Sequence, residues 1–156
     1  MGVNERVGQV SANSVAEVFQ HTAAKAGDRV AIRTLGDTVT WTWSEYAQRV
    51  EEMAAAMTAH GVARGDTVGV MLTNRPEFHV IDSAAMHLGA APFSVYNTSP
   101  ASLIETLIAN SGCRVIFTEV AFLPAVAAAA EKTGVDVVVV DEDEPVFGEG
   151  LSTYLS

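Results

Sequence analysis

The chain contains several segments in which apolar residues recur with helical spacing. The clearest follows Thr42, where four apolar residues are spaced by 4, 3 and 4 positions: Tyr46, Val50, Met53 and Met57. Polar side chains occupy the other side of this segment: Gln48, Arg49, Glu51 and Glu52. The pattern predicts an amphipathic helix that packs on a core through one face and stops at Gly61.

Two capping boxes mark helix starts. Ser14 is followed three residues later by Glu17, and Thr42 by Glu45, so that each hydroxyl can accept a backbone N–H while the carboxylate reaches back. The first box predicts a helix from Ser14 to about Ala26. The second opens the helix described above.

Two runs rich in β-branched and aromatic residues lie between these helices, at 30–35 and 38–42. Gly36-Asp37 separates them, which is typical of a two-residue hairpin turn. We therefore expect an N-terminal β-hairpin.

After Gly65 the chain alternates between strand-like and helix-like segments. The predicted strands are 67–73, 91–95, 114–118 and 135–140. The predicted helices open at Asn74-Arg75-Pro76-Glu77 and end at Gly89, then run from Ser99-Pro100 to about Asn110 and from Ala121 to Lys132. This alternation predicts an α/β fold with a mostly parallel sheet flanked by helices. We expect a loose arm over 1–13, an α/β subdomain over 14–140 and an acidic exit linker over 141–156.

Charge and composition narrow the classes of partner. The 156-residue chain has a formal charge of −10 and only two lysines, with no basic cluster. Nucleic acids and anionic membranes need a basic surface, so both are excluded as partners. Cys113 is the single cysteine, no secretion signal is evident, and no apolar run reaches the ~20 residues that span a bilayer. We expect a cytoplasmic protein without an integral membrane segment.

Ligands of parallel sheets bind beyond the carboxyl ends of the strands, which here are the loops at Thr73-Asn74, Tyr96-Asn97-Thr98 and Thr118-Glu119. No glycine-rich phosphate loop occurs there. Three glycines have roles in a helix stop, a turn and a strand: Gly61, Gly65 and Gly69. The two lysines, Lys25 and Lys132, are at predicted helix ends.

His79, Asp82, Ser83 and His87 share one face of a predicted helix. The two histidines are eight residues apart, about 12 Å along the axis, which is too far to share a zinc ion. Cys113 is expected to pack as a small apolar residue. No serine hydrolase motif and no calcium-loop pattern is present, so we assign no catalytic, cofactor-binding or metal-binding residue.

Residues from Thr40 to Thr118 resemble the opening region of the adenylate-forming enzymes, which include acyl-CoA synthetases, luciferases and peptide-synthetase adenylation domains. Five segments carry the resemblance in order and spacing: Thr40–Tyr46, Gly61–Val70, Asn74–Phe78, Leu88–Ala90 and Ser111–Ile116. The segment Pro92–Pro100 is similar to the version found in long-chain fatty acyl-CoA synthetases.

The resemblance implies a reaction in which a fatty acid, ATP and CoA give acyl-CoA, AMP and pyrophosphate with the help of Mg²⁺. It also implies that the family's phosphate loop, adenine motif, ribose-binding aspartate, hinge and C-terminal lysine would follow residue 156. We therefore expect an N-terminal fragment that binds no cofactor, is inactive alone, and is completed by a downstream part of the synthetase.

Two alternatives stay open. The chain could be a stand-alone binding or assembly module that reuses the fold without the chemistry. A weaker alternative is an unrelated doubly wound nucleotide-binding domain, against which the absent glycine loop argues. Aryl and amino acid substrates also remain possible for the complete enzyme.

Overall fold

The computed structural model describes residues 12–140. In that range the elements follow in the order α1 (Val15–Ala26), β1 (Val30–Arg33), the 3-10 helix η2 (Leu35–Asp37), β2 (Thr40–Thr42), α2 (Trp43–Ala59), β3 (Thr67–Met71), α3 (Pro76–His87), β4 (Ala91–Ser94), α4 (Ala101–Ser111), β5 (Val115–Glu119), α5 (Leu123–Thr133) and β6 (Asp136–Val140). The predicted alternation of strands and helices is confirmed. The acidic linker predicted over 141–156, and the predicted arm up to residue 11, lie outside the described residues.

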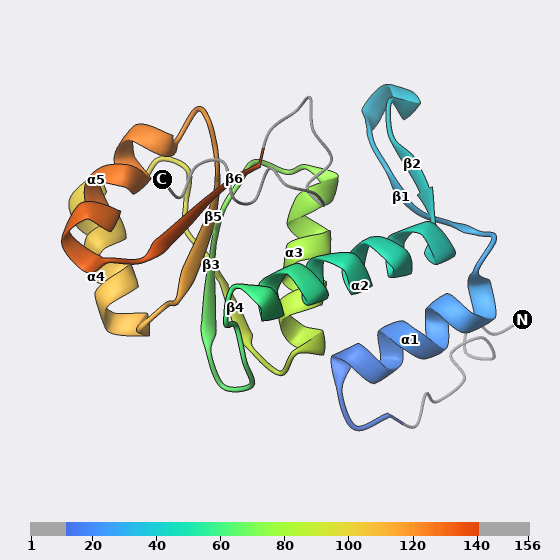
Figure 1. The fold of residues 1–156 in the computed structure, drawn as a ribbon. Coiled ribbons are helices and arrows are strands. Elements are labelled where there is room, and N and C mark those ends of the chain that lie inside the picture. Colours follow the sequence, from blue (N-terminus) through green and yellow to red (C-terminus); the bar gives the residue numbers. More distant parts are fainter. Residues whose placement is uncertain (1–11, 141–156) are drawn as a thin grey trace, which may run out of the picture.

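A four-stranded parallel sheet forms the centre, with strand order β4-β3-β5-β6. Helices cover both faces: α2 and α3 lie on one side and α4 and α5 on the other (Figure 1). Each face of the sheet has its own hydrophobic core, and alternate residues of the central strands point to opposite faces. Val70 and Phe117 pack in the core with α2 and α3, and Met71 and Ile116 pack in the core with α4 and α5. Burial on both faces explains the nearly continuous apolar sequence of β3 and β5.

Helix α2 begins and ends as its sequence predicts. The Thr42 hydroxyl accepts the backbone N–H of Glu45, and the Glu45 carboxylate accepts the N–H of Thr42, which completes the capping box. The four residues of the predicted apolar stripe are all buried: Tyr46, Val50, Met53 and Met57. Gly61 has φ 81° just beyond the end of the helix, a left-handed conformation that glycine adopts without a steric penalty.

Helix α1 packs on α2 and α3 from the outside, and none of its side chains is fully buried. Ser14 caps it by accepting the N–H of Glu17, as predicted. The Glu17 carboxylate accepts the N–H of Asn13, one residue earlier than a capping box requires. The main anchor of α1 is the Phe19 ring, which packs edge-on against the rings of Tyr46 and His87.

The predicted two-residue turn at Gly36-Asp37 is wrong, because residues 34–39 form a longer connection between β1 and β2. The Thr34 hydroxyl accepts the backbone N–H of Val39, and the Thr34 N–H donates to the Val39 carbonyl. Side-chain bonds of this kind compete with strand pairing, so the ladder stops early and Leu35 projects into solvent at the tip.

The start of α5 also differs from the prediction. The helix begins at Leu123 and not at Ala121, because the N–H groups of Phe122 and Leu123 donate to the carbonyls of Glu119 and Val120 in a preceding turn. Strand β5 correspondingly runs to Glu119. This one-residue extension brings the Glu119 side chain to the end of β5.

Candidate functional site

The order of the strands places the candidate crevice between β3 and β5. The chain leaves β3 toward β4 on one side and returns with β5 on the other, so the connections diverge at the carboxyl ends of β3 and β5. Ligands of open parallel sheets bind at such a divergence. Met71 pairs with Thr118 there, which puts two of the predicted loops next to one another.

A side chain of the protein itself occupies the place expected for a ligand. The Glu119 carboxylate accepts the backbone N–H of Thr73, and it accepts the Thr73 hydroxyl at 2.8 Å. The Glu119 side chain is only 13% exposed. The backbone donor that an anionic ligand would use is therefore already bonded to a carboxylate.

Arg75 extends this contact into a largely buried network. Its Nε lies 2.7 Å from Oε2 of Glu77, and its guanidinium lies 3.9 Å from Oε2 of Glu119. One positive charge thus faces two negative charges. Pro76 holds the first position of α3, and Glu77 sits in the first turn, where the helix dipole favours an acid. Arg75 pairs with both Glu77 and Glu119, and the three side chains together carry one net negative charge. A phosphate group placed here would therefore be repelled.

The third predicted loop does not join this network. Tyr96 follows β4, on the side of β3 away from β5, and its side chain is 85% exposed. Thr118 is fully buried between the strands. The carboxyl edge therefore consists of a closed centre at Thr73 and Glu119 and an exposed tyrosine at its margin.

Two polar side chains of α3, those of Ser83 and His87, have hydrogen-bond partners within the protein. The Tyr46 hydroxyl lies 2.7 Å from the Ser83 hydroxyl and 3.0 Å from the His79 carbonyl, which links α2 to α3. Nδ1 of His87 lies 2.7 Å from the Ser83 carbonyl. Burial raises the pKa of Asp82, and the nearby charge of His79 partly opposes this. Within residues 12–140, no group of three or more His, Cys, Asp or Glu side chains could hold a metal ion.

The Cys113 thiol is buried and donates to the Val115 carbonyl at 3.0 Å. Burial raises the pKa of Cys113, and hydrogen bonds with the Gly69 and Val115 backbone partly counter that effect. A thiol held protonated is a poor nucleophile. Its packing agrees with the role expected from the sequence.

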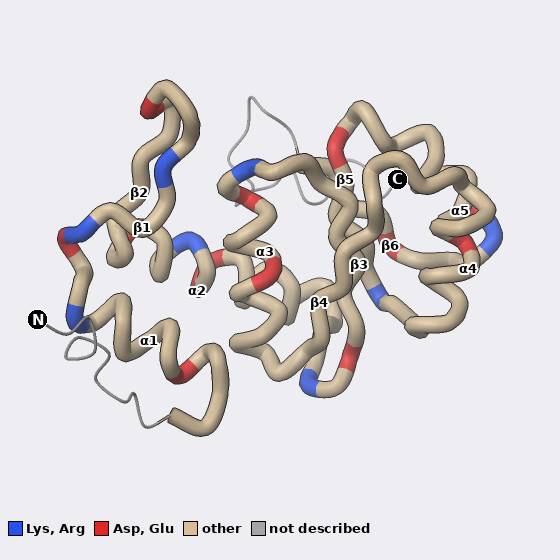
Figure 2. Tube along the Cα trace, turned by 180° about the vertical axis from the view of Figure 1, so that it is seen from behind, with Lys and Arg blue, Asp and Glu red and all other residues tan. Residues whose placement is uncertain are grey.

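The glycines and lysines lie as their sequence contexts predict. Gly61 and Gly65 have positive φ at a helix stop and a turn, and Gly69 lies within β3 against Ile116. Lys132 pairs with Glu105 at 2.7 Å near the end of α5. Figure 2 shows Lys and Arg scattered among acidic positions over the described trace, without a basic stripe. No helix of the described residues is long and apolar enough to cross a membrane.

Comparison with known proteins identifies similar chains. The family described as AMP-binding enzyme matches residues 19–154. An uncharacterised protein of Mycobacterium tuberculosis is 44% identical over 115 residues, which cover 74% of this chain and 66% of that protein. The N-terminal domain of FACL13 from Mycobacterium tuberculosis has a TM-score of 0.80 at 20% identity, over 91% of this chain and 36% of that one.

Two longer relatives match with lower identity. The acetyl-coenzyme A synthetase of Streptomyces coelicolor is 30% identical over 76% of this chain, and the long-chain-fatty-acid–CoA ligase FadD15 of Mycobacterium bovis is 31% identical over 69%. The matches cover only 20% and 18% of these two relatives. The chain therefore spans about a fifth of the length of these two relatives. It spans slightly under two thirds of the uncharacterised Mycobacterium tuberculosis protein.

Proposed function

Because the chain belongs to the AMP-binding enzyme family, we propose that it forms the N-terminal part of an acyl-CoA ligase and is inactive alone. The complete enzyme would join a fatty acid to CoA: the carboxylate attacks the α-phosphorus of ATP and releases pyrophosphate, and the CoA thiol then displaces AMP. ATP, Mg²⁺ and CoA would be bound by the complete enzyme. We assign residues 14–140 as the folded subdomain and place the protein in the cytoplasm.

The observation that carries the proposal of inactivity is the bonding of Glu119 and Arg75 at the carboxyl ends of β3 and β5. The backbone donor of Thr73 is bonded to Glu119, and Arg75 is paired with Glu77. A nucleotide phosphate needs free N–H groups or an unpaired cation. The residues of this crevice do not fit ATP, which supports a structural contribution of this segment to a larger enzyme.

The choice of fatty acids rests on the segment Pro92–Pro100, which is similar to that of long-chain fatty acyl-CoA synthetases. It forms β4 and the turn that follows, where Tyr96 is exposed and available to contact further protein. FadD15 of Mycobacterium bovis acts on long-chain fatty acids by its name. The similarity to an acetyl-coenzyme A synthetase makes shorter acids the competing substrate class.

Pyrophosphate release tests the proposal directly. The purified chain is incubated with ATP, Mg²⁺, CoA and a long-chain fatty acid, next to a blank without the acid and a complete fatty acyl-CoA ligase as positive control. We expect no acid-dependent release from the chain. Release above the blank would show that the chain holds a functional nucleotide site and would refute its inactivity.

A chimera tests the structural contribution. The region of a complete fatty acyl-CoA ligase that matches this chain is replaced by residues 14–140, and acid-dependent pyrophosphate release is measured with fatty, acetic and benzoic acids. Activity with a fatty-acid preference would support the proposal. A folded chimera without adenylate formation on any acid would contradict it.

A second candidate is a stand-alone binding or assembly module. The 115 matched residues make up 66% of the uncharacterised Mycobacterium tuberculosis protein, which is therefore also a short chain. The DNA downstream of the gene separates the two candidates. A frame that encodes the family's phosphate loop and lysine motifs would favour the ligase, and unrelated sequence would favour the module.

A further inference from the structure

A groove lies between α1, α2 and the end of α3, away from the carboxyl edge of the sheet. Its volume is about 470 Å³, within the range of small-molecule sites. Six apolar side chains form its walls: Phe19, Ala23, Ala47, Val50, Ala54 and Leu88. Four of the six are the small side chains of alanine or valine, which leave space between the helices.

Helix α1, which forms one wall of the groove, is incompletely buried. Its sequence is amphipathic, yet none of its side chains is fully buried, and Val15 and Val18 are 65% and 38% exposed. Amphipathic helices normally bury their apolar stripe on a core. The helix rests on the Phe19 ring, and the small Ala23 that follows along the same groove does not fill it.

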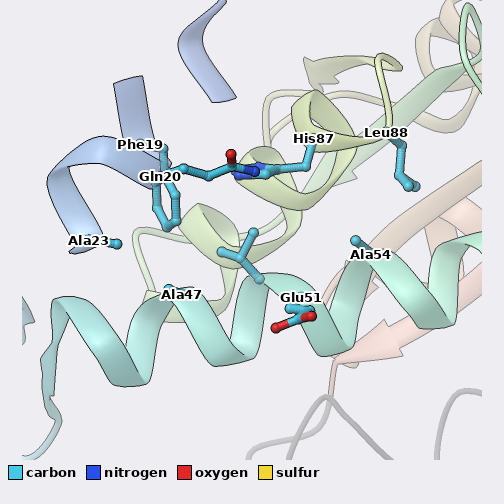
Figure 3. A pocket seen from close by; sticks show the side chains of 9 residues that line it. Phe19, Gln20, Ala23, Ala47, Glu51, Ala54, His87 and Leu88 are labelled. Carbon is cyan, nitrogen blue, oxygen red and sulfur yellow. The ribbon is translucent and has the colours of Figure 1, made fainter. Parts of the chain in front are cut away.

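Three polar side chains line the same groove: Gln20, Glu51 and His87. Figure 3 shows Gln20 from α1 and His87 from α3 extended toward one another, with Glu51 on the α2 side. Neither lysine nor arginine is among the lining residues. The fixed charge of the groove is therefore negative.

His87 adds a second acceptor. Nδ1 of its ring lies 2.7 Å from the Ser83 carbonyl, and because a carbonyl only accepts, Nδ1 carries the hydrogen. In the neutral ring Nε2 is then a hydrogen-bond acceptor. Beside the Gln20 amide, the groove thus holds a carboxylate and an imidazole nitrogen, which match a donor that is positively charged.

We propose that this groove binds a small amphipathic monoamine. The apolar body lies between α1 and α2, and the ammonium group pairs with the Glu51 carboxylate at the α2 side of the groove. A fatty carboxylate has the wrong charge for this site, so the inference is independent of the substrate proposed above. An alkylammonium carries three N–H donors, like a lysine side chain.

Titration of the ¹⁵N-labelled chain with three six-carbon probes tests the proposal by NMR at neutral pH and constant ionic strength. Hexylamine carries the cation, hexanol is its neutral counterpart and hexanoate its anionic one. We expect saturable shifts of amides around Phe19, Ala47 and Ala54 with hexylamine. Its affinity should exceed that of hexanol by about 5-fold, as for a partly exposed ion pair.

Two variants with a matched control locate the site. Glu51→Gln should weaken hexylamine about 5-fold and leave hexanol unchanged. Glu52→Gln, on the next residue but outside the groove and hydrogen-bonded to Gln48, should change neither. Ala54→Leu fills the groove and should weaken both probes. Circular dichroism verifies that each variant is folded.

Several results would overturn the proposal. Hexanoate or hexanol binding as tightly as hexylamine would remove the role of charge. Equal effects of the Glu51 and Glu52 substitutions would place the amine on the general acidic surface. A lack of saturable shifts with millimolar hexylamine would exclude the site altogether.

Discussion

The Glu119 carboxylate bonds to both the backbone N–H and the hydroxyl of Thr73, 46 residues earlier in the chain. The contact ties the ends of the two central strands together and draws in Arg75. It therefore contributes to the shape of the carboxyl edge of the sheet.

Removal of this carboxylate should destabilise the fold. Glu119→Ala leaves the Thr73 N–H without its acceptor and Arg75 with one acid fewer, at an expected loss of about 1–3 kcal/mol in the free energy of unfolding. Glu119→Gln keeps one carbonyl acceptor and should lose less. Urea denaturation measures both, with the exposed Glu131→Ala as control. Equal stability of Glu119→Ala and the wild type would mean that water replaces the contact.

Tyr46 and Ser83 should be energetically coupled through their hydrogen bond. Tyr46→Phe removes the hydroxyl and leaves the buried Ser83 without this partner, so we expect a loss of about 1–2 kcal/mol. Ser83→Ala made in the Tyr46→Phe background should cost little more. A double-mutant cycle from chemical denaturation measures the coupling. Additive losses would show that the two side chains contribute separately.

The capping box of α2 should make stability depend on acid pH. Bonds from the Thr42 backbone N–H, and then from its hydroxyl, lower the pKa of Glu45 from its ordinary value of 4.5. The stabilisation by the ionised carboxylate is present above that value and is lost as the pH falls through the lowered folded pKa.

Glu45→Gln tests this dependence because glutamine imitates the protonated acid. Its melting temperature should be lower than that of the wild type at pH 7, and the gap should narrow below the ordinary pKa of the carboxylate. Thermal melts across the acid range provide the comparison. A gap that stays constant with pH would attribute the effect to side-chain shape and not to charge.

Asp82 should weaken the fold at neutral pH. Burial raises the pKa of Asp82, so its ionised form is less favourable in the folded chain than in the unfolded chain. Stability linked to the protonated form is present below the unfolded pKa and is lost as the pH rises through the raised folded pKa. Asp82→Asn should therefore add about 0.5 kcal/mol at pH 7 and almost nothing in strong acid.

Melting curves at pH 7 and pH 3 measure this gain, with the exposed Asp28→Asn as a control for the amide substitution itself. A lower melting temperature of Asp82→Asn at pH 7 would show that the charge interaction of Asp82 with His79 outweighs its burial.

Features set by local sequence were predicted well. The Thr42 capping box, the apolar face of α2 and the stop at Gly61 depend on residues a few positions apart, whose spacing is visible in the chain. The same holds for the buried strands β3 and β5. Their continuous apolar sequence reports burial on both faces.

The network of the candidate site could not be predicted. Thr73, Arg75 and Glu119 meet only because β5 returns to the side of β3 away from β4, and the sequence does not encode that order in any single segment. The N-terminal hairpin was predicted correctly, but its turn was not, for a different reason. A hydroxyl at Thr34 diverts the Val39 N–H from the ladder, and strand propensity does not include such competition.

The shallow attachment of α1 has a consequence for how the molecule comes apart. Free energies of local opening follow the amount of buried contact, so the amides of α1 should exchange with deuterium before those of β3 and β5. Detachment of this helix would leave the parallel sheet and its four flanking helices intact. We therefore expect a peripheral segment that opens and closes many times within the lifetime of the folded centre.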